Sequence, residues 1–176
     1  DRMTELVADK HWDEVGALFA ENVVSEDRRR GLQRESHDRA IEVANLRTIT
    51  DQGVVNIVAT PLATRGDRLC LNHVTLYSDD GLGADSLVVI GVEDGLIVAM
   101  IAFDVAARDH AYVELDAHYL AGEAAPYAPT WSTLASAFVA LNRHEIPPTT
   151  GDYAVVDHQL HYSVSEAGGL SEFLHA

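Results

Sequence analysis

Three residues near the C-terminus have the types and spacing of a metal site. Asp157, His158 and His161 carry one carboxylate and two imidazoles within five positions. The surrounding residues, 153–164, have the composition of a strand, on which alternate side chains point to opposite faces. Asp157 and His161 would then share one face and His158 the other, so three ligands do not converge. The sequence therefore predicts no structural metal site here.

Cofactor chemistry finds no support elsewhere in the chain. The sequence contains neither a glycine-rich phosphate loop nor a nucleophile elbow. Cys70 is the single cysteine, so it cannot form an intrachain disulfide, and we expect it to be a small core residue. We therefore expect no cofactor, and a cytoplasmic location fits the cysteine usage.

The charged residues are unevenly distributed. The chain has 28 Asp and Glu against 12 Lys and Arg, for a net charge of −16. This excess disfavours nucleic acid and anionic membranes as partners, and no apolar run approaches the roughly 20 residues of a membrane span. We predict neither partner.

Five arginines nevertheless fall within one short segment, directly after Asp27. They are Arg28, Arg29, Arg30, Arg34 and Arg39. The segment could recognise an anionic ligand or another domain, or it could be a solvated stretch that offsets the acidic remainder. An ion pair between Asp27 and one of these arginines is available in either case.

The elements that must position these groups follow from the hydrophobic periods. We expect two short helices within residues 3–20, a short strand within 22–29, a helix over 37–49, and strands at 54–60, 68–77, 86–92 and 96–104. Gly66 and Gly95 mark turns between successive strands. This order predicts an α+β fold in which the N-terminal helices pack on one face of a curved antiparallel sheet.

The C-terminal part repeats the order of the N-terminal part. Helical periods over 109–122 and 131–142 precede the strand at 153–164, and Trp131 corresponds to Trp12. We therefore predict a domain at 1–106 and a partial second copy, helix-helix-strand, at 107–176. That copy would pack on the first or on the partner in a homodimer. The abrupt start without Met suggests a piece of a longer chain.

Residues 19–27, Phe-Ala-Glu-Asn-Val-Val-Ser-Glu-Asp, resemble the nuclear transport factor 2-like superfamily. This is the cone-shaped α+β fold of ketosteroid isomerase and the SnoaL-like polyketide cyclases. Residues 93–103 are similar to the family's final hairpin, so the resemblance covers about residues 3–104. The fold hosts isomerases, cyclases, hydrolases and binding domains, so it does not by itself identify the function.

The resemblance implies a site. Asp27 falls on the carboxylate that ketosteroid isomerase uses as its general base, whereas Met3 and Leu87 fall on its two oxyanion donors, which argues against steroid isomerisation. Asp104 falls on a cavity-lining position, so Asp27 and Asp104 would share one apolar cavity and one of them would hold a proton near neutral pH. The alternatives are purely structural roles: Asp27 would form an ion pair with an arginine, and Asp104 would cap a turn.

Further ligand-binding candidates follow from the same placement. Leu87, Val89, Met100 and Ala102 are predicted to line the cavity; Arg28, with Arg65 or Arg68 as alternatives, would supply a cation; and either Asn72 or His73 would face inward.

Two functions remain open. The first is binding of a small apolar molecule with acid–base chemistry of the isomerase, cyclase or epoxide hydrolase type. The second is a non-catalytic ligand-sensing or structural domain, because residues 131–133 and 140–148 resemble tails of large actinobacterial cyclase and ATPase regulators.

Overall fold

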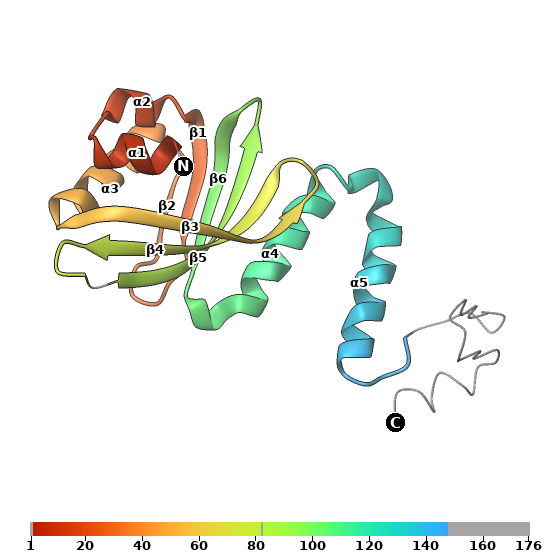
Figure 1. The fold of residues 1–176 in the computed structure, drawn as a ribbon. Coiled ribbons are helices and arrows are strands. Elements are labelled where there is room, and N and C mark those ends of the chain that lie inside the picture. Colours follow the sequence, from red (N-terminus) through yellow and green to blue (C-terminus); the bar gives the residue numbers. More distant parts are fainter. Residues whose placement is uncertain (1, 82, 148–176) are drawn as a thin grey trace, which may run out of the picture. The chain divides into compact units, whose positions relative to one another are not determined.

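Three N-terminal helices precede or interrupt the first strands of the sheet (Figure 1). In the computed structural model, which describes residues 2–81 and 83–147, they are α1 (Arg2–Ala8), α2 (Trp12–Gly16) and α3 (Arg39–Asp51). Asp38 caps α3, because its Oδ1 accepts a hydrogen bond from the Ala40 amide at 2.7 Å. The two short helices and the third one are thus confirmed.

The described residues form one curved sheet in the order β2-β1-β6-β5-β4-β3 (Figure 1). Its strands are β1 (Phe19–Asp27), β2 (Arg34–Ser36), β3 (Val54–Arg65), β4 (Leu69–Ser78), β5 (Gly83–Glu93) and β6 (Leu96–Phe103). The α+β class is confirmed, but the sheet is mixed, since β1 and β6 run parallel. Short β2 was not expected, because three residues are too few to show a period.

A tight hairpin sets the register at the centre of the sheet. Asp94 and Gly95 connect β5 and β6, both with positive φ (49° and 79°), as a two-residue type I′ turn requires. The ladder then pairs Leu87 with Phe103 and Val88 with Ala102. Directly opposed residues point to the same face, so Val88 and Ala102 share one face and Leu87 and Phe103 the other.

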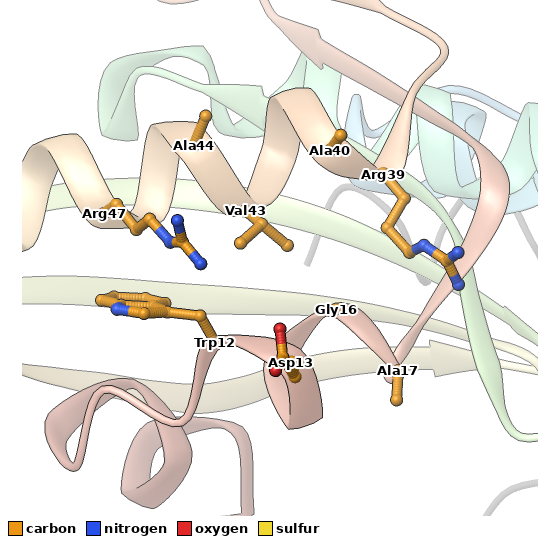
Figure 2. Close-up of a pocket in the computed structure, with 9 residues that line it drawn as sticks. All are labelled: Trp12, Asp13, Gly16, Ala17, Arg39, Ala40, Val43, Ala44 and Arg47. Carbon is orange, nitrogen blue, oxygen red and sulfur yellow. The ribbon is translucent and has the colours of Figure 1, made fainter.

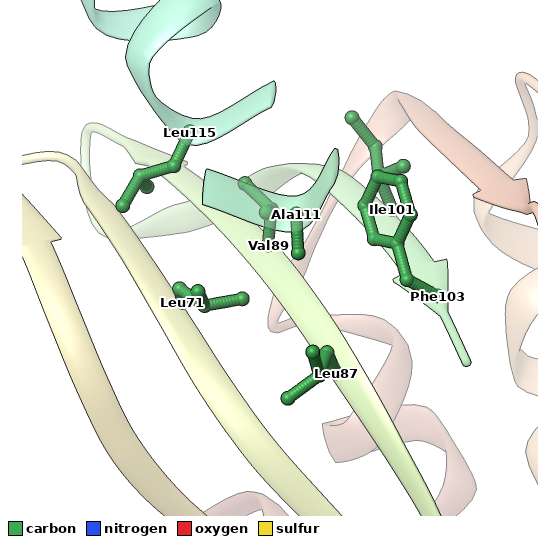
Figure 3. Close-up of a cluster of buried hydrophobic side chains, with 7 residues drawn as sticks. All are labelled: Leu71, Leu87, Val89, Ile101, Phe103, Ala111 and Leu115. Atoms are coloured by element: carbon green, nitrogen blue, oxygen red, sulfur yellow. The ribbon is translucent and has the colours of Figure 1, made fainter. Parts of the chain in front are cut away.

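The face that carries Leu87 is covered by α4 (Arg108–Ala121). Its Ala111 and Leu115 pack on a fully buried strand cluster (Figure 3). The strand members are Leu71, Leu87, Val89, Ile101 and Phe103. Helices therefore cover both faces of this sheet rather than one, because a central strand that is apolar on both faces must be buried on both.

The N-terminal helices bury a second cluster on the opposite side. It comprises Leu6, Val7, Val15, Phe19 and Val23, with Leu46, Ile57, Ile97 and Met100 partly buried against it. The two clusters hold α1 to α3 and α4 to the same sheet, so α4 belongs to the first compact unit, residues 1–123.

The second unit covers residues 124–176. Its described part contains a short turn of 3-10 helix, Ala125–Tyr127, and α5 (Ala128–Asn142), which confirms the helix expected at 131–142. The strand expected at 153–164 and Asp157, His158 and His161 lie outside the described residues, so the partial second copy stays a prediction. Among the described helices, none has the length and apolar character needed to cross a membrane.

Candidate functional site

A cavity of about 210 Å³ lies on the Val88 face of the sheet, beneath α1 and α3. We call it the cup. Its apolar walls include Phe19, Leu46, Ile57, Val74, Leu76, Val88, Ile90, Met100 and Ala102. Its volume is smaller than the roughly 300–1,000 Å³ of cavities for drug-sized ligands. The cup therefore suits a small molecule.

The polar end of the cup holds Asp27, the last residue of β1. Its side chain is 9% exposed, and Oδ2 accepts a hydrogen bond from Arg29 Nη2 at 2.6 Å. Oδ1 accepts from Arg29 Nε at 2.9 Å and from the Arg29 amide at 3.1 Å. Arg29 comes back to Asp27 because the chain turns directly after the strand.

The charge state of Asp27 follows from these contacts. Burial raises the pKa of Asp27, but the hydrogen bonds and charge of Arg29, together with the charge of Arg34, outweigh burial and leave the pKa below its usual value. Asp27 is therefore ionised at neutral pH. Of the two acids expected to share a proton, Asp27 is therefore not the one that holds it.

A second buried carboxylate, Glu42 of α3, completes the polar end. It is 4% exposed and accepts hydrogen bonds from four donor atoms of three residues. These are Arg34 Nη1 (3.0 Å) and Nη2 (3.3 Å), Ser36 Oγ (2.8 Å) and Asn45 Nδ2 (3.2 Å). Arg34 lies opposite Asp27 in the antiparallel ladder of β1 and β2. The unexpected strand β2 thus brings this cation to the cup.

Asp104 does not join Asp27 in the cup. It follows β6, and its Oδ2 accepts a hydrogen bond from the Arg30 amide at 3.0 Å, outside the residues that line the cavity. Asp104 thus anchors the loop between β1 and β2. The predicted pair of carboxylates in one cavity is wrong, because the position after a strand serves here to fix a neighbouring turn.

The four predicted wall residues divide between the two faces of the sheet. Met100 and Ala102 line the cup, whereas Leu87 and Val89 lie under α4 in the cluster of Figure 3. Their neighbours Val88 and Ile90 line the cup instead. The error is one residue of register, which exchanges the two faces of a strand.

The predicted cations also lie elsewhere. Arg28 is on the α4 face, where Nη1 lies 2.7 Å from Glu114 Oε2 and the guanidinium stacks 5.4 Å from the Phe103 ring centroid. Arg65 pairs with Asp116 and Arg68 with Glu93. The arginines that line the cup are Arg29 and Arg34.

Asn72 and His73 occupy opposite faces of β4. Asn72 pairs with Val88 on the cup's face but does not line the cup, and its Oδ1 accepts a weak hydrogen bond from Cys70 Sγ at 3.4 Å. His73 pairs with Leu87, and its Nε2 lies 3.3 Å from Asp85 Oδ1. Neither candidate is brought to Asp27.

Two serines in the cup were missed by sequence reasoning. Ser25 and Ser86 are each 4% exposed and line the cavity. Met3, which the resemblance placed at the position of an oxyanion donor, also lines it. Ser25 could have been found, since it lies two residues before Asp27 and strands alternate with a period of two. Ser86 could be found only by knowing which alternate residues of β5 face the cup.

Another hollow, of about 430 Å³, lies between α2 and α3 (Figure 2). Its floor is made of small side chains, and the Arg47 guanidinium lies 5.4 Å from the Trp12 ring centroid at one end. Arg39 stands at the other end (Figure 2). The hollow is larger than the cup but holds no buried carboxylate, so the cup is the better candidate site.

Metal binding has no candidate ligands in the described part of the chain. No group of three or more His, Cys, Asp or Glu side chains is arranged there to hold an ion. The polar groups that the described residues place at the cup are carboxylates, guanidinium groups and hydroxyls.

No family model matches the chain, and no curated protein matches it. A similar solved structure is a de novo designed protein with a curved β-sheet, 13% identical, covering 63% of this chain and 86% of that chain, with a TM-score of 0.48. The epoxide hydrolase/cyclase-like enzyme SalBIII, with a role in pyran ring formation in salinomycin, is 15% identical, covers 58% and 84%, and has a TM-score of 0.46.

A third is a nuclear transport factor 2-like protein of unknown function from Burkholderia xenovorans, 12% identical, covering 57% and 74%, with a TM-score of 0.45. Further similar structures carry the names of ketosteroid isomerases, polyketide cyclases and SnoaL-like isomerases. These are the groups that the sequence resemblance named. At these identities and TM-scores the likeness assigns no chemistry to this chain.

Proposed function

We propose that this protein binds a small, mainly apolar molecule in the cup and performs cofactor-free acid–base chemistry on it, with Asp27 as the base. The reaction would be of the isomerase, cyclase or epoxide hydrolase kind. One observation carries the proposal: the Asp27 carboxylate lies at the polar end of a cavity whose other walls are mainly apolar. Apolar cavities with a few convergent polar groups are the usual form of small-molecule sites.

The contacts of Asp27 support a role as base. Its lowered pKa keeps it ionised, as a proton acceptor must be, although a low pKa also weakens a base. A bound apolar ligand would expel water and increase the burial that raises the pKa of Asp27. Once Asp27 holds the proton, Arg29 becomes available to stabilise negative charge that develops on the ligand.

The ion pair of Asp27 and Arg29 also favours a second candidate function, ligand binding without catalysis. Arg29 engages both oxygens of Asp27, and such a pair at a strand end also serves simply to fix the following turn. The cup would then bind an effector without turnover, as a ligand-sensing or structural domain of a larger actinobacterial regulatory protein.

The proposal includes assembly and location. We expect a homodimer in the cytoplasm, with the residues after α4 packed on the first unit or on the partner. A strictly monomeric protein in light scattering would contradict the dimer.

The Asp27→Asn variant separates the two functions. Wild type and variant are tested for isomerisation of 3-cyclohexen-1-one and hydrolysis of cyclohexene oxide, and binding of each compound is followed by NMR. We expect turnover of at least one compound by the wild type and none by the variant, with fold and affinity unchanged. Asp85→Asn is the matched control, because Asp85 is half exposed and contacts Thr75 and His73 outside the cup.

Unchanged turnover in Asp27→Asn would overturn the role of Asp27 as base. Binding by the wild type without turnover of either compound would favour the ligand-sensing function.

A further inference from the structure

Two buried hydroxyls in the cup have no hydrogen-bond partner among the residues that the structure describes. Ser25 and Ser86 are 4% exposed, and neither Oγ makes a hydrogen bond within residues 2–81 and 83–147. Neither Oγ belongs to the completely buried polar atoms of those residues that lack a hydrogen-bond partner. Each Oγ therefore keeps some solvent-accessible surface. Because both residues line the cup, that surface opens into the cavity.

Unpartnered buried hydroxyls are unusual and call for a reason. This chain does pair a buried serine elsewhere: Ser36 is 7% exposed, and its Oγ donates to Glu42 Oε1 at 2.8 Å. A hydroxyl that lacks such a partner loses the hydrogen bonds it made to water in the unfolded chain. Ser25 and Ser86 therefore leave donor and acceptor capacity open to a water or a ligand oxygen in the cup.

The two serines stand on opposite sides of Asp27. Asp27, Ala102 and Val88 form one row across β1, β6 and β5. Ser25 lies in the next row on one side, beside Met100, and Ser86 lies beyond Val88 on the other side. A ligand that covers the Asp27 row can therefore place an oxygen atom at either serine.

The two buried carboxylates at the polar end of the cup are already paired with cations. Asp27 pairs with Arg29 at 2.6 Å and Glu42 with Arg34 at 3.0 Å. A charged ligand would have to displace one of these pairs, whereas a neutral oxygen needs only the free hydroxyls. This pairing favours an uncharged ligand.

We propose that Ser25 and Ser86 bind carbonyl or hydroxyl oxygens of an uncharged, mainly apolar ligand and so determine which ligands the cup accepts. The inference rests on the proposed binding of a small molecule in the cup. It does not depend on catalysis by Asp27. Serine suits the role because its hydroxyl can both donate and accept a hydrogen bond.

A pair of matched ligands tests the inference. The probes are 4-tert-butylcyclohexanone and its methylene analogue, in which a CH2 group replaces the carbonyl oxygen. Their affinities are measured by NMR titration for wild type, Ser25→Ala, Ser86→Ala and the double variant. We expect wild type to prefer the ketone by roughly tenfold, as one satisfied hydrogen bond allows, and the double variant to have no preference.

Thermal unfolding without ligand provides a second readout. Alanine at 25 or 86 removes an unpaired buried hydroxyl, so the Tm should stay the same or rise. Ser36→Ala is the matched control, and its Tm should fall because Glu42 loses a hydrogen bond. A lower Tm for both cup variants would show that their hydroxyls serve the fold, and would overturn the inference.

The other outcomes are equally distinct. If both probes bind wild type with the same affinity, or the double variant keeps the preference for the ketone, the role of the serines is wrong while binding in the cup stands. If neither probe binds, the proposed function and this inference are both overturned.

Discussion

Arg29 holds both carboxylate oxygens of Asp27, with Nε 2.9 Å from Oδ1 and Nη2 2.6 Å from Oδ2. Two parallel hydrogen bonds between guanidinium and carboxylate fix orientation as well as charge. The pair therefore sets the direction in which Asp27 faces the cup, whether the protein catalyses a reaction or only binds.

Loss of stability in acid should reveal the Asp27–Arg29 pair. The pKa of Asp27 is lower in the folded chain than the unfolded value of about 3.9, so its contribution is present above that value and is lost as the pH falls through the folded pKa. We expect Asp27→Asn to lower the free energy of unfolding by roughly 1.5–3 kcal/mol near neutral pH, with the difference from wild type shrinking below about pH 4.

Urea unfolding of both proteins across this pH range measures the difference. Glu114, whose pKa is raised by burial but lowered overall by Arg28 and His118, is present in both proteins and cancels in the comparison. A difference that grows in acid would contradict the prediction.

Neighbouring residues of β5 should respond in opposite ways. Leu87→Ala removes a fully buried side chain under α4 and should cost about 2–5 kcal/mol of stability, while the folded protein keeps its affinity for 4-tert-butylcyclohexanone. Val88→Trp places a large ring in a cup of about 210 Å³ and should abolish that affinity. Chemical denaturation and NMR titration separate the effects, and the reverse pattern would show that the register is wrong.

Glu42 should be important for stability. Replacing it by Gln removes the charge that pairs with Arg34 and one of its two acceptor oxygens, inside a site that is 4% exposed. We expect a loss of roughly 2–3 kcal/mol and faster hydrogen exchange in β2. Glu35→Gln on β2 is the control, because Glu35 is exposed and pairs only with His37 among the described contacts. Equal effects of the two changes would contradict a special role for Glu42.

Truncation should show where the first unit ends. A chain that ends at residue 106 lacks α4 and exposes the buried cluster around Leu71 and Leu87, so we expect no cooperative unfolding transition. A chain that ends at residue 123 keeps α4 and should unfold cooperatively. Circular dichroism melting compares the two, and a cooperative transition of the shorter chain would support the boundary expected from the repeat.

Local patterns predicted most of the elements. Alternating β-branched residues indicated β3 to β6, helical spacing indicated α1 to α5, and Asp94-Gly95 indicated the central hairpin. Strand β2 and the parallel pairing of β1 with β6 were missed, because pairing joins residues far apart in sequence and leaves no local period.

The candidate site was predictable only in part. Asp27, Met100 and Ala102, which the family resemblance assigned to a cavity, line the cup. Leu87 and Val89 were placed on the wrong face by one residue of register. Arg29 and Arg34 were not distinguished from the other arginines of their segment.

The sequence by itself determined the α+β class, the acidic composition and the position of Asp27 at a strand end, because these depend on residue types and local periods. Only the tertiary structure decided which face of each strand meets the cup and which arginine pairs with which acid. A strand alternates with a period of two, so one residue of register exchanges its faces. An ion pair depends on how the chain turns after the strand, and in this protein that turn brings Arg29 back to Asp27 and directs Arg28 to α4.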